Sequence, residues 1–136
     1  GSREIAPLRP GARVLVAEDN SINALVLRKI LEKSGMAVDT VRTGTEALEA
    51  VTRQDYQVVL MDISMPGMDG ITATRHIRAG ETTGADAQVP IVAITAHAMK
   101  GDRDRFIEAG MNGYIAKPFT REEVVATIRE IIAGGE

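Results

Sequence analysis

The sequence predicts an α/β fold, an open parallel sheet of five strands that is doubly wound by five helices. The first observation is an alternation that occurs five times: a short apolar run is followed by a longer segment whose apolar residues recur at helical spacing. The second observation is that most of the runs are apolar throughout, which is typical of strands covered on both faces. Right-handed crossovers place the helices on both faces of the sheet, so a (βα)5 domain is expected.

The expected elements follow one another closely along the chain. The strands are expected at residues 13–17, 37–41, 58–62, 91–95 and 113–116. The helices are expected at residues 22–34, after Thr43, at residues 71–79, at residues 100–109 and after Thr120. There is no internal repeat, so these elements make up one domain.

The first helix is defined by its apolar face and its end. Gly35 is expected to end it, because glycine favours the left-handed conformation that often follows a helix. The residues expected on its buried face recur three and four positions apart and are Val26, Leu27, Ile30 and Leu31. Asn20 or Ser21 is expected to cap its start.

The later helices are defined by turn and capping residues. Thr43 with Glu46, and Thr120 with Glu123, are two capping boxes, in which the threonine accepts from the main chain and the glutamate reaches back. Residues 65–70 have the composition of a turn and lead into the third helix, and residues 80–88 form a polar loop.

Composition excludes several classes of function. The chain has no cysteine, which excludes disulfides, thiolate zinc sites and cysteine nucleophiles and favours a reducing, cytoplasmic location. Its net charge of -3 gives no general attraction to nucleic acid or to anionic membranes. Residues 1–12, which begin with Gly-Ser and contain two prolines, are interpreted as a cleavage scar and linker, and residues 134–136 as a tail. Excision from a longer protein is therefore expected.

Polar residues follow four of the expected strands, at the point where each strand ends. Glu18 and Asp19 follow the first strand, Asp62 ends the third, Thr95 ends the fourth, and Lys117 follows the fifth. The carboxyl ends of parallel strands meet at one edge of a sheet, where ligands bind, so these side chains are expected to lie together. Three carboxylates repel one another unless a proton or cation joins them, and Mg²⁺ prefers oxygen ligands. We expect a magnesium site beside a carboxylate that accepts a phosphoryl group.

Four segments carry a resemblance to a known family. They are Val16-Ala17-Glu18-Asp19-Asn20, Met61-Asp62-Ile63-Ser64-Met65-Pro66-Gly67-Met68-Asp69-Gly70, Ile94-Thr95-Ala96 and Ala116-Lys117-Pro118-Phe119. In this order and spacing, they resemble the response regulator receiver domain over residues 12–133. The resemblance implies a flavodoxin-like (CheY-like) sheet with strand order 2-1-3-4-5. It also implies transfer of a phosphoryl group from a phosphohistidine to Asp62.

The resemblance assigns roles to the polar residues at the strand ends. It implies Mg²⁺ held directly by Asp19 and Asp62, through water by Glu18, and by the backbone carbonyl of Ser64. It further implies that Lys117 and Thr95 contact the phosphoryl group. A cis peptide bond between Lys117 and Pro118 is expected on the same ground.

The resemblance also implies a switch and a means of setting its lifetime. Phosphate would draw the Thr95 hydroxyl inward and leave space for the ring of Tyr114 to turn in, changing the face built by the last two helices and the last strand. The alternative is a fixed, half-buried tyrosine. Ser64 and His97 would control the access of water to the phosphoryl group, which the aspartyl-phosphate lifetime of their alanine variants would test. The alternative for His97 is a solvent-facing loop residue.

The first helix predicts a partner surface. At 100° per residue, Asn23, Val26, Leu27 and Ile30 gather on one side. Ile22 and Leu25 lie away from them, next to the acidic edge, where they would be exposed. Such a patch suits a helical bundle that presents a phosphohistidine, either the dimerisation helices of a histidine kinase or a histidine phosphotransfer protein. Scattered apolar surface residues are the alternative.

Two other classes of function are alternatives to the phosphoacceptor receiver. A haloacid dehalogenase-type phosphatase also uses an aspartyl nucleophile, but it needs a second aspartate two residues later, where this chain has Ser64. A degenerate receiver that only binds proteins is disfavoured because all the chemical residues are present. The stretch Thr95-Ala96-His97-Ala98-Met99 resembles receivers of hybrid histidine kinases. We therefore expect a phosphoacceptor domain, not an enzyme acting on a separate substrate.

Overall fold

The computed structural model describes residues 12–81 and 84–134 and contains one parallel sheet of five strands in the order β2-β1-β3-β4-β5. The strands are β1 (Arg13–Ala17), β2 (Ala37–Val41), β3 (Val58–Asp62), β4 (Ile91–Thr95) and β5 (Gly113–Ala116). The helices are α1 (Ser21–Lys33), α2 (Gly44–Arg53), α3 (Gly70–Arg78), α4 (Lys100–Ala109) and α5 (Arg121–Gly134). The predicted fold class and strand order are confirmed.

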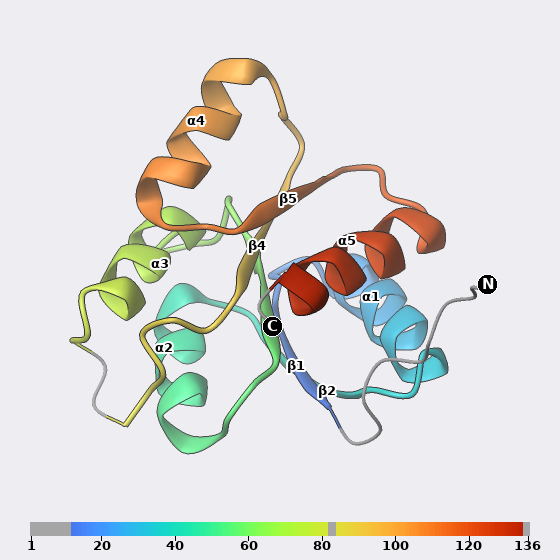
Figure 1. Cartoon of the computed structure of the whole chain (residues 1–136), viewed down its shortest axis with the longest axis horizontal. Coiled ribbons are helices and arrows are strands. Elements are labelled where there is room, and N and C mark those ends of the chain that lie inside the picture. Colours follow the sequence, from blue (N-terminus) through green and yellow to red (C-terminus); the bar gives the residue numbers. More distant parts are fainter. Residues whose placement is uncertain (1–11, 82–83, 135–136) are drawn as a thin grey trace.

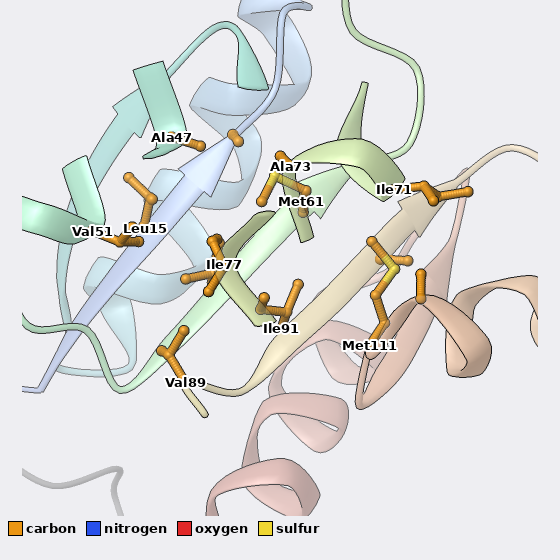
Figure 2. Packing of buried hydrophobic residues seen from close by; sticks show 14 of the residues in the cluster. Leu15, Ala47, Val51, Met61, Ile71, Ala73, Ile77, Val89, Ile91 and Met111 are labelled. Atoms are coloured by element: carbon orange, nitrogen blue, oxygen red, sulfur yellow. The ribbon is translucent and has the colours of Figure 1, made fainter. Parts of the chain in front are cut away.

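Helices cover both faces of the sheet. As Figure 1 shows, α1 and α5 lie on one side, and α2, α3 and α4 lie on the other. Successive side chains of a strand point to opposite faces, so each strand contributes to two apolar cores. Figure 2 shows one of them, in which Leu15, Met61 and Ile91 of the central strands lie among Val51 of α2 and Ile77 of α3. The other core joins the opposite face to α1 and α5.

Helices α1 and α5 begin as their capping residues predict, and α2 does so in part. The side chain of Asn20 accepts a hydrogen bond from the Asn23 amide at 2.9 Å and caps α1. Thr120 and Glu123 form the full reciprocal capping box of α5. At α2, Thr43 accepts from the Glu46 amide, but the Glu46 carboxylate reaches back to the amide of Arg42 instead of that of Thr43.

The buried face of α1 is narrower than predicted. Leu27 and Leu31 are fully buried and Ile30 partly, whereas Val26 is 42% exposed. The prediction for Val26 was wrong because α1 packs along the single i, i+4 line of Leu27 and Leu31. Val26 is one position before Leu27, so its side chain lies 100° around the helix from that of Leu27 and away from the sheet.

The boundaries of the domain extend slightly beyond the prediction. Ala12, predicted as linker, is buried, and its carbonyl accepts a hydrogen bond from the Ala37 amide at 2.8 Å. Helix α5 continues to Gly134, one residue into the predicted tail. The rest of the predicted linker, residues 1–11, and residues 135–136 lie outside the described residues. No helix within the described ranges is long and apolar enough to cross a membrane.

Arg78 ties three segments together at the end of the sheet opposite the acidic residues. Its guanidinium donates hydrogen bonds of 2.8 Å to the carbonyls of Gly110 and Ala87 and to the side-chain oxygen of Asn112. The same oxygen of Asn112 accepts from the amide of Ile91, the first residue of β4. Burial lowers the pKa of Arg78 from its usual value. This network fixes the turn between α4 and β5 against α3.

Candidate functional site

Three carboxylates meet at the carboxyl edge of the sheet. Glu18 and Asp19 follow β1, and Asp62 ends the neighbouring strand β3. One carboxylate oxygen of each residue lies within 4.8 Å of an oxygen of both other residues. Glu18 and Asp62 are almost completely buried, at 1% and 2% exposure, and Asp19 is half-buried. The predicted acidic cluster is therefore present as a compact group at the strand ends.

Main-chain groups hold these acids in place. The amide of Asn20 donates to Glu18 Oε2 at 3.1 Å, and the amide of Ser64 donates to Asp62 Oδ1 at 2.9 Å. The amide of Glu18 donates to the carbonyl of Val41 at the end of β2. Two carboxylate oxygens are thus oriented by amides of the next turn, and the loop after β1 is anchored to β2.

Lys117 is the cation inside the cluster. Its Nζ donates a hydrogen bond of 3.0 Å to Asp62 Oδ2 and lies 3.4 Å from Glu18 Oε1. The peptide bond between Lys117 and Pro118 is cis, as expected. Burial by itself would lower the pKa of Lys117, but its hydrogen bond to Asp62 and the charges of Asp62 and Glu18 outweigh burial and raise it. Lys117 therefore stays protonated and leaves the cluster one cation for three acids.

The excess of negative charge in the cluster mainly affects the pKa of Glu18. Burial, with a further contribution from neighbouring Asp62, raises the pKa of Glu18 to about 7, although the Asn20 amide and Lys117 oppose the shift. Its Oε1 is buried and accepts no hydrogen bond from the described residues, because the 3.4 Å contact with Lys117 lacks hydrogen-bond geometry. An all-oxygen site with a buried oxygen in need of a partner fits a hard divalent cation such as Mg²⁺.

The contacts of Thr95 and Tyr114 lie outside the acidic cluster. The hydroxyl of Thr95 donates to the carbonyl of His97 at 2.8 Å and accepts from the amide of His97 at 3.0 Å. The ring of Tyr114 on β5 is 36% exposed, and the guanidinium carbon of Arg103 lies 5.6 Å from its centroid. The structure therefore shows an outward tyrosine together with a threonine hydroxyl engaged by the next loop.

The remaining predicted site residues lie around the acidic edge. Ser64 and His97 are both exposed, and their effect on phosphoryl lifetime stays a prediction. Ile22 is 71% and Leu25 51% exposed at the start of α1. A cavity of about 260 Å³ next to Leu25 reaches Glu18 and is also lined by Arg28 and Arg42.

Three residues near the site were not singled out from the sequence. Arg42 donates from its guanidinium to the carbonyl of Asp19 at 3.1 Å and so supports the acidic loop. Gly70 lies against the backbone of Asp62, and Arg103 covers the ring of Tyr114. No local motif marks an arginine that acts across the fold. Gly70 could have been noticed because it begins a helix. Residues with side chains are tolerated at that position, so a glycine there is a signal of close packing.

Comparison with known proteins agrees with this geometry. The sequence model of the response regulator receiver domain family matches residues 14–129. Sensor protein GacS of Pseudomonas syringae pv. syringae is 40% identical over 116 residues, which are 85% of this chain and 13% of GacS. The chain thus corresponds to a small part of this curated relative.

Two solved structures are similar over almost the whole domain. One is the receiver domain of sensor histidine kinase PA1611 from Pseudomonas aeruginosa PAO1, with a magnesium ion coordinated in the active site cleft. It is 42% identical with a TM-score of 0.80, covering 90% of this chain and 98% of that one. The other is the Saccharomyces cerevisiae receiver domain of Ssk1 in complex with the phosphotransfer protein Ypd1. It is 28% identical with a TM-score of 0.83, covering 94% and 93%. By sequence and by fold, this chain belongs to the response regulator receiver domain family of two-component signalling.

Proposed function

We propose that this domain accepts a phosphoryl group from a phosphohistidine onto Asp62 and passes the change to a partner surface. The observation that carries the proposal is the hydrogen bond from Lys117 Nζ to Asp62 Oδ2 inside a cluster of three carboxylates. An ammonium placed on the reacting carboxylate is suited to the charge of an arriving phosphoryl group. The domain would catalyse its own phosphorylation and dephosphorylation and act on no separate substrate.

The residues present account for the transfer step. An oxygen of Asp62 attacks phosphorus, the bond between phosphorus and the histidine nitrogen breaks, and the imidazole leaves with the electron pair. A carboxylate nucleophile has no proton to give up, so no general base is needed. Lys117 and, after it turns, the Thr95 hydroxyl would bind the equatorial oxygens of the phosphoryl group.

The acidic cluster would hold Mg²⁺. Asp19 and Asp62 would bind the ion directly, Glu18 through water, and Ser64 through its backbone carbonyl. A bound Mg²⁺ supplies positive charge to the oxygens of the transferred group. The magnesium in the active site cleft of the PA1611 receiver domain supports this assignment.

Asp62→Asn is expected to abolish phosphorylation completely. With acetyl phosphate and Mg²⁺, intact mass spectrometry should detect one phosphoryl adduct on the wild-type domain and none on D62N or in the presence of EDTA. Asp55→Asn is the control, because Asp55 is exposed in the loop before β3 and its variant should be phosphorylated normally. Phosphorylation of D62N would refute the proposal. An unmodified wild type after rapid quenching would favour a binding module instead.

We propose that the phosphodonor docks on the start of α1. Ile22 and Leu25 are exposed apolar side chains at the start of α1, and Leu25 lines the same cavity as Glu18. Their neighbourhood fits the apolar face of a helical bundle that carries a phosphohistidine, either kinase dimerisation helices or a phosphotransfer protein. The solved complex of Ypd1 with the Ssk1 receiver domain supports such a partner. The similarity to the receiver domain of sensor histidine kinase PA1611 supports a place in a hybrid histidine kinase.

Ile22→Asp is expected to slow transfer from a protein donor about tenfold, the effect of losing an apolar contact of roughly 1.4 kcal/mol. Phosphorylation by acetyl phosphate should stay unchanged, since Ile22 is 71% exposed and outside the acidic cluster. The measurement is the transfer rate from a panel of phosphorylated histidine phosphotransfer proteins that includes Ypd1. Ile107→Asp is the control, because Ile107 is 65% exposed on the distant helix α4. Equal slowing with acetyl phosphate would contradict the docking role.

We also propose that Thr95 and Tyr114 form the switch. In the described state the side chain of Tyr114 is partly exposed, and the Thr95 hydroxyl is bound by the main chain of His97. A phosphoryl group on Asp62 would compete for that hydroxyl, and the space it leaves would admit the ring of Tyr114. The surface of α4, β5 and α5 would change with the ring.

A further inference from the structure

We propose that Arg103 acts as a latch that holds Tyr114 outward. It would thereby set the fraction of unphosphorylated molecules that already have the switched surface. The proposal rests on the proposed switch of Thr95 and Tyr114. It adds a residue of α4 that makes no contact with the acidic cluster or with the phosphoryl group.

The contact itself has the geometry of a cation–π interaction. The guanidinium carbon of Arg103 lies 5.6 Å from the centroid of the Tyr114 ring. A cation within about 6 Å of a ring centroid is attracted by the negative face of the ring. The ring is 36% exposed, so the arginine provides part of its cover in the outward position.

The surroundings of Arg103 leave the ring as its partner. Arg105, two residues later on α4, forms an ion pair with Asp102 at 3.4 Å. Among the residues that the structure describes, no carboxylate forms an ion pair with Arg103. Met99 and Ile107, one helical turn before and after Arg103, are 74% and 65% exposed. Arg103 thus lies in the middle of an exposed stripe along α4, directly over the outward ring.

The contact stabilises only one of the two states. When Tyr114 turns toward the space beside Thr95, its ring leaves the guanidinium, so the attraction is lost in the inward state. An interaction made in one state alone shifts the equilibrium by its full strength. For an exposed cation–π contact the shift is about two- to fivefold in the ratio of inward to outward rings.

The sequence makes this ratio measurable. The chain has two tyrosines, Tyr56 and Tyr114. Tyr56 is an internal reference, because its hydroxyl donates to Asp39 at 2.8 Å. Asp39 lies on β2, the edge strand at the opposite side of the sheet from β5. NMR spectra of protein labelled with ¹³C in the tyrosine rings would therefore contain one reporting and one reference residue. Beryllofluoride with Mg²⁺, a mimic of the phosphoryl group, would define the shifts of the switched state.

The experiment compares wild type with three variants, without any phosphodonor. Arg103→Ala should move the Tyr114 signals toward the beryllofluoride position, with the inward fraction raised about two- to fivefold. Arg103→Lys, which keeps a cation, should move them less. Arg105→Ala, which removes the same charge from the same helix, should leave them in place. The Tyr56 signals should stay constant in all four proteins.

Three outcomes would overturn the latch, and they differ in what they say about the switch. Tyr114 signals that beryllofluoride moves but Arg103→Ala does not would refute the latch alone. Equal movement in Arg103→Ala and Arg105→Ala would replace it with a general charge effect on α4. Tyr114 signals that beryllofluoride fails to move in wild type would refute the proposed switch and the latch together.

Discussion

Gly70→Ala is expected to lower the free energy of unfolding of this domain by about 3 kcal/mol, more than any other single methyl group added near the site. A Cβ at Gly70 would lie 2.2 Å from the carbonyl oxygen of Asp62 and 2.9 Å from Cγ of Met61. The carbonyl cannot move away cheaply, because β3 is hydrogen-bonded to β1 on one side and to β4 on the other. Helix α3 would have to move instead, and its start is fixed by Asp69, which caps the amide of Thr72 at 2.8 Å.

The same variant should lose magnesium affinity, since the part of the clash that a shift of α3 does not relieve falls on the backbone of Asp62 and displaces its carboxylate from Glu18 and Lys117. Urea unfolding with and without Mg²⁺ measures both effects. Gly101→Ala is the matched control: a Cβ at Gly101, in the first turn of α4, would meet no atom within 4 Å. Alanine should stabilise the helix there by about 0.5 to 1 kcal/mol. A loss below about 1 kcal/mol for Gly70→Ala would mean that α3 shifts easily and would contradict the packing argument.

The strand-end residues could be predicted because their positions follow from topology. Once the chain alternates strand and helix, Glu18, Asp19, Asp62, Thr95 and Lys117 must reach one edge of a parallel sheet. The ladder between β1 and β3 then sets Ala17 beside Met61, and the acids that follow meet as expected. Periodicity alone left the strand order open, and only the resemblance supplied it.

The residues that act across the fold could not be predicted. Arg78 joins α3 to Gly110 and Asn112, more than thirty positions away, and Arg103 reaches a ring on β5. An arginine on a helix surface has the same local pattern whether it binds water or a distant partner. Val26 shows the converse limit, because helical spacing gives the direction of a side chain but not how wide a stripe the sheet covers.

The buried acid Glu18 links the stability of the domain to pH. Its pKa of about 7 in the folded state lies above its value of 4.5 in the unfolded chain, chiefly because burial disfavours the charge. Between these two pH values the folded domain binds a proton that the unfolded chain has released. Without a metal, stability should therefore be highest at the acidic end of this window and fall as the pH rises toward 7, by on the order of 2 to 3 kcal/mol.

Magnesium should reverse this trend. The cation competes with the proton on Glu18, so its affinity and the stability it adds should both rise as the pH approaches 7. Glu18→Gln removes the titrating group and keeps the shape of the side chain. It should flatten the metal-free dependence of stability on pH, and it should weaken the response to Mg²⁺. Urea unfolding from pH 5 to pH 7.5, with Mg²⁺ or with EDTA, measures all four curves.

Glu108→Gln is the control for this series, because Glu108 is exposed on α4, away from the acidic cluster. Its curves should follow those of wild type, because the two proteins share Glu18 and every other group near the acidic cluster. The difference between wild type and Glu18→Gln then isolates Glu18. A metal-free wild type whose stability rises between pH 5 and 7 relative to Glu18→Gln would show that Glu18 is ionised throughout. In that case Lys117 would neutralise the cluster more fully than its 3.4 Å distance from Glu18 implies, and the pocket would need the metal less.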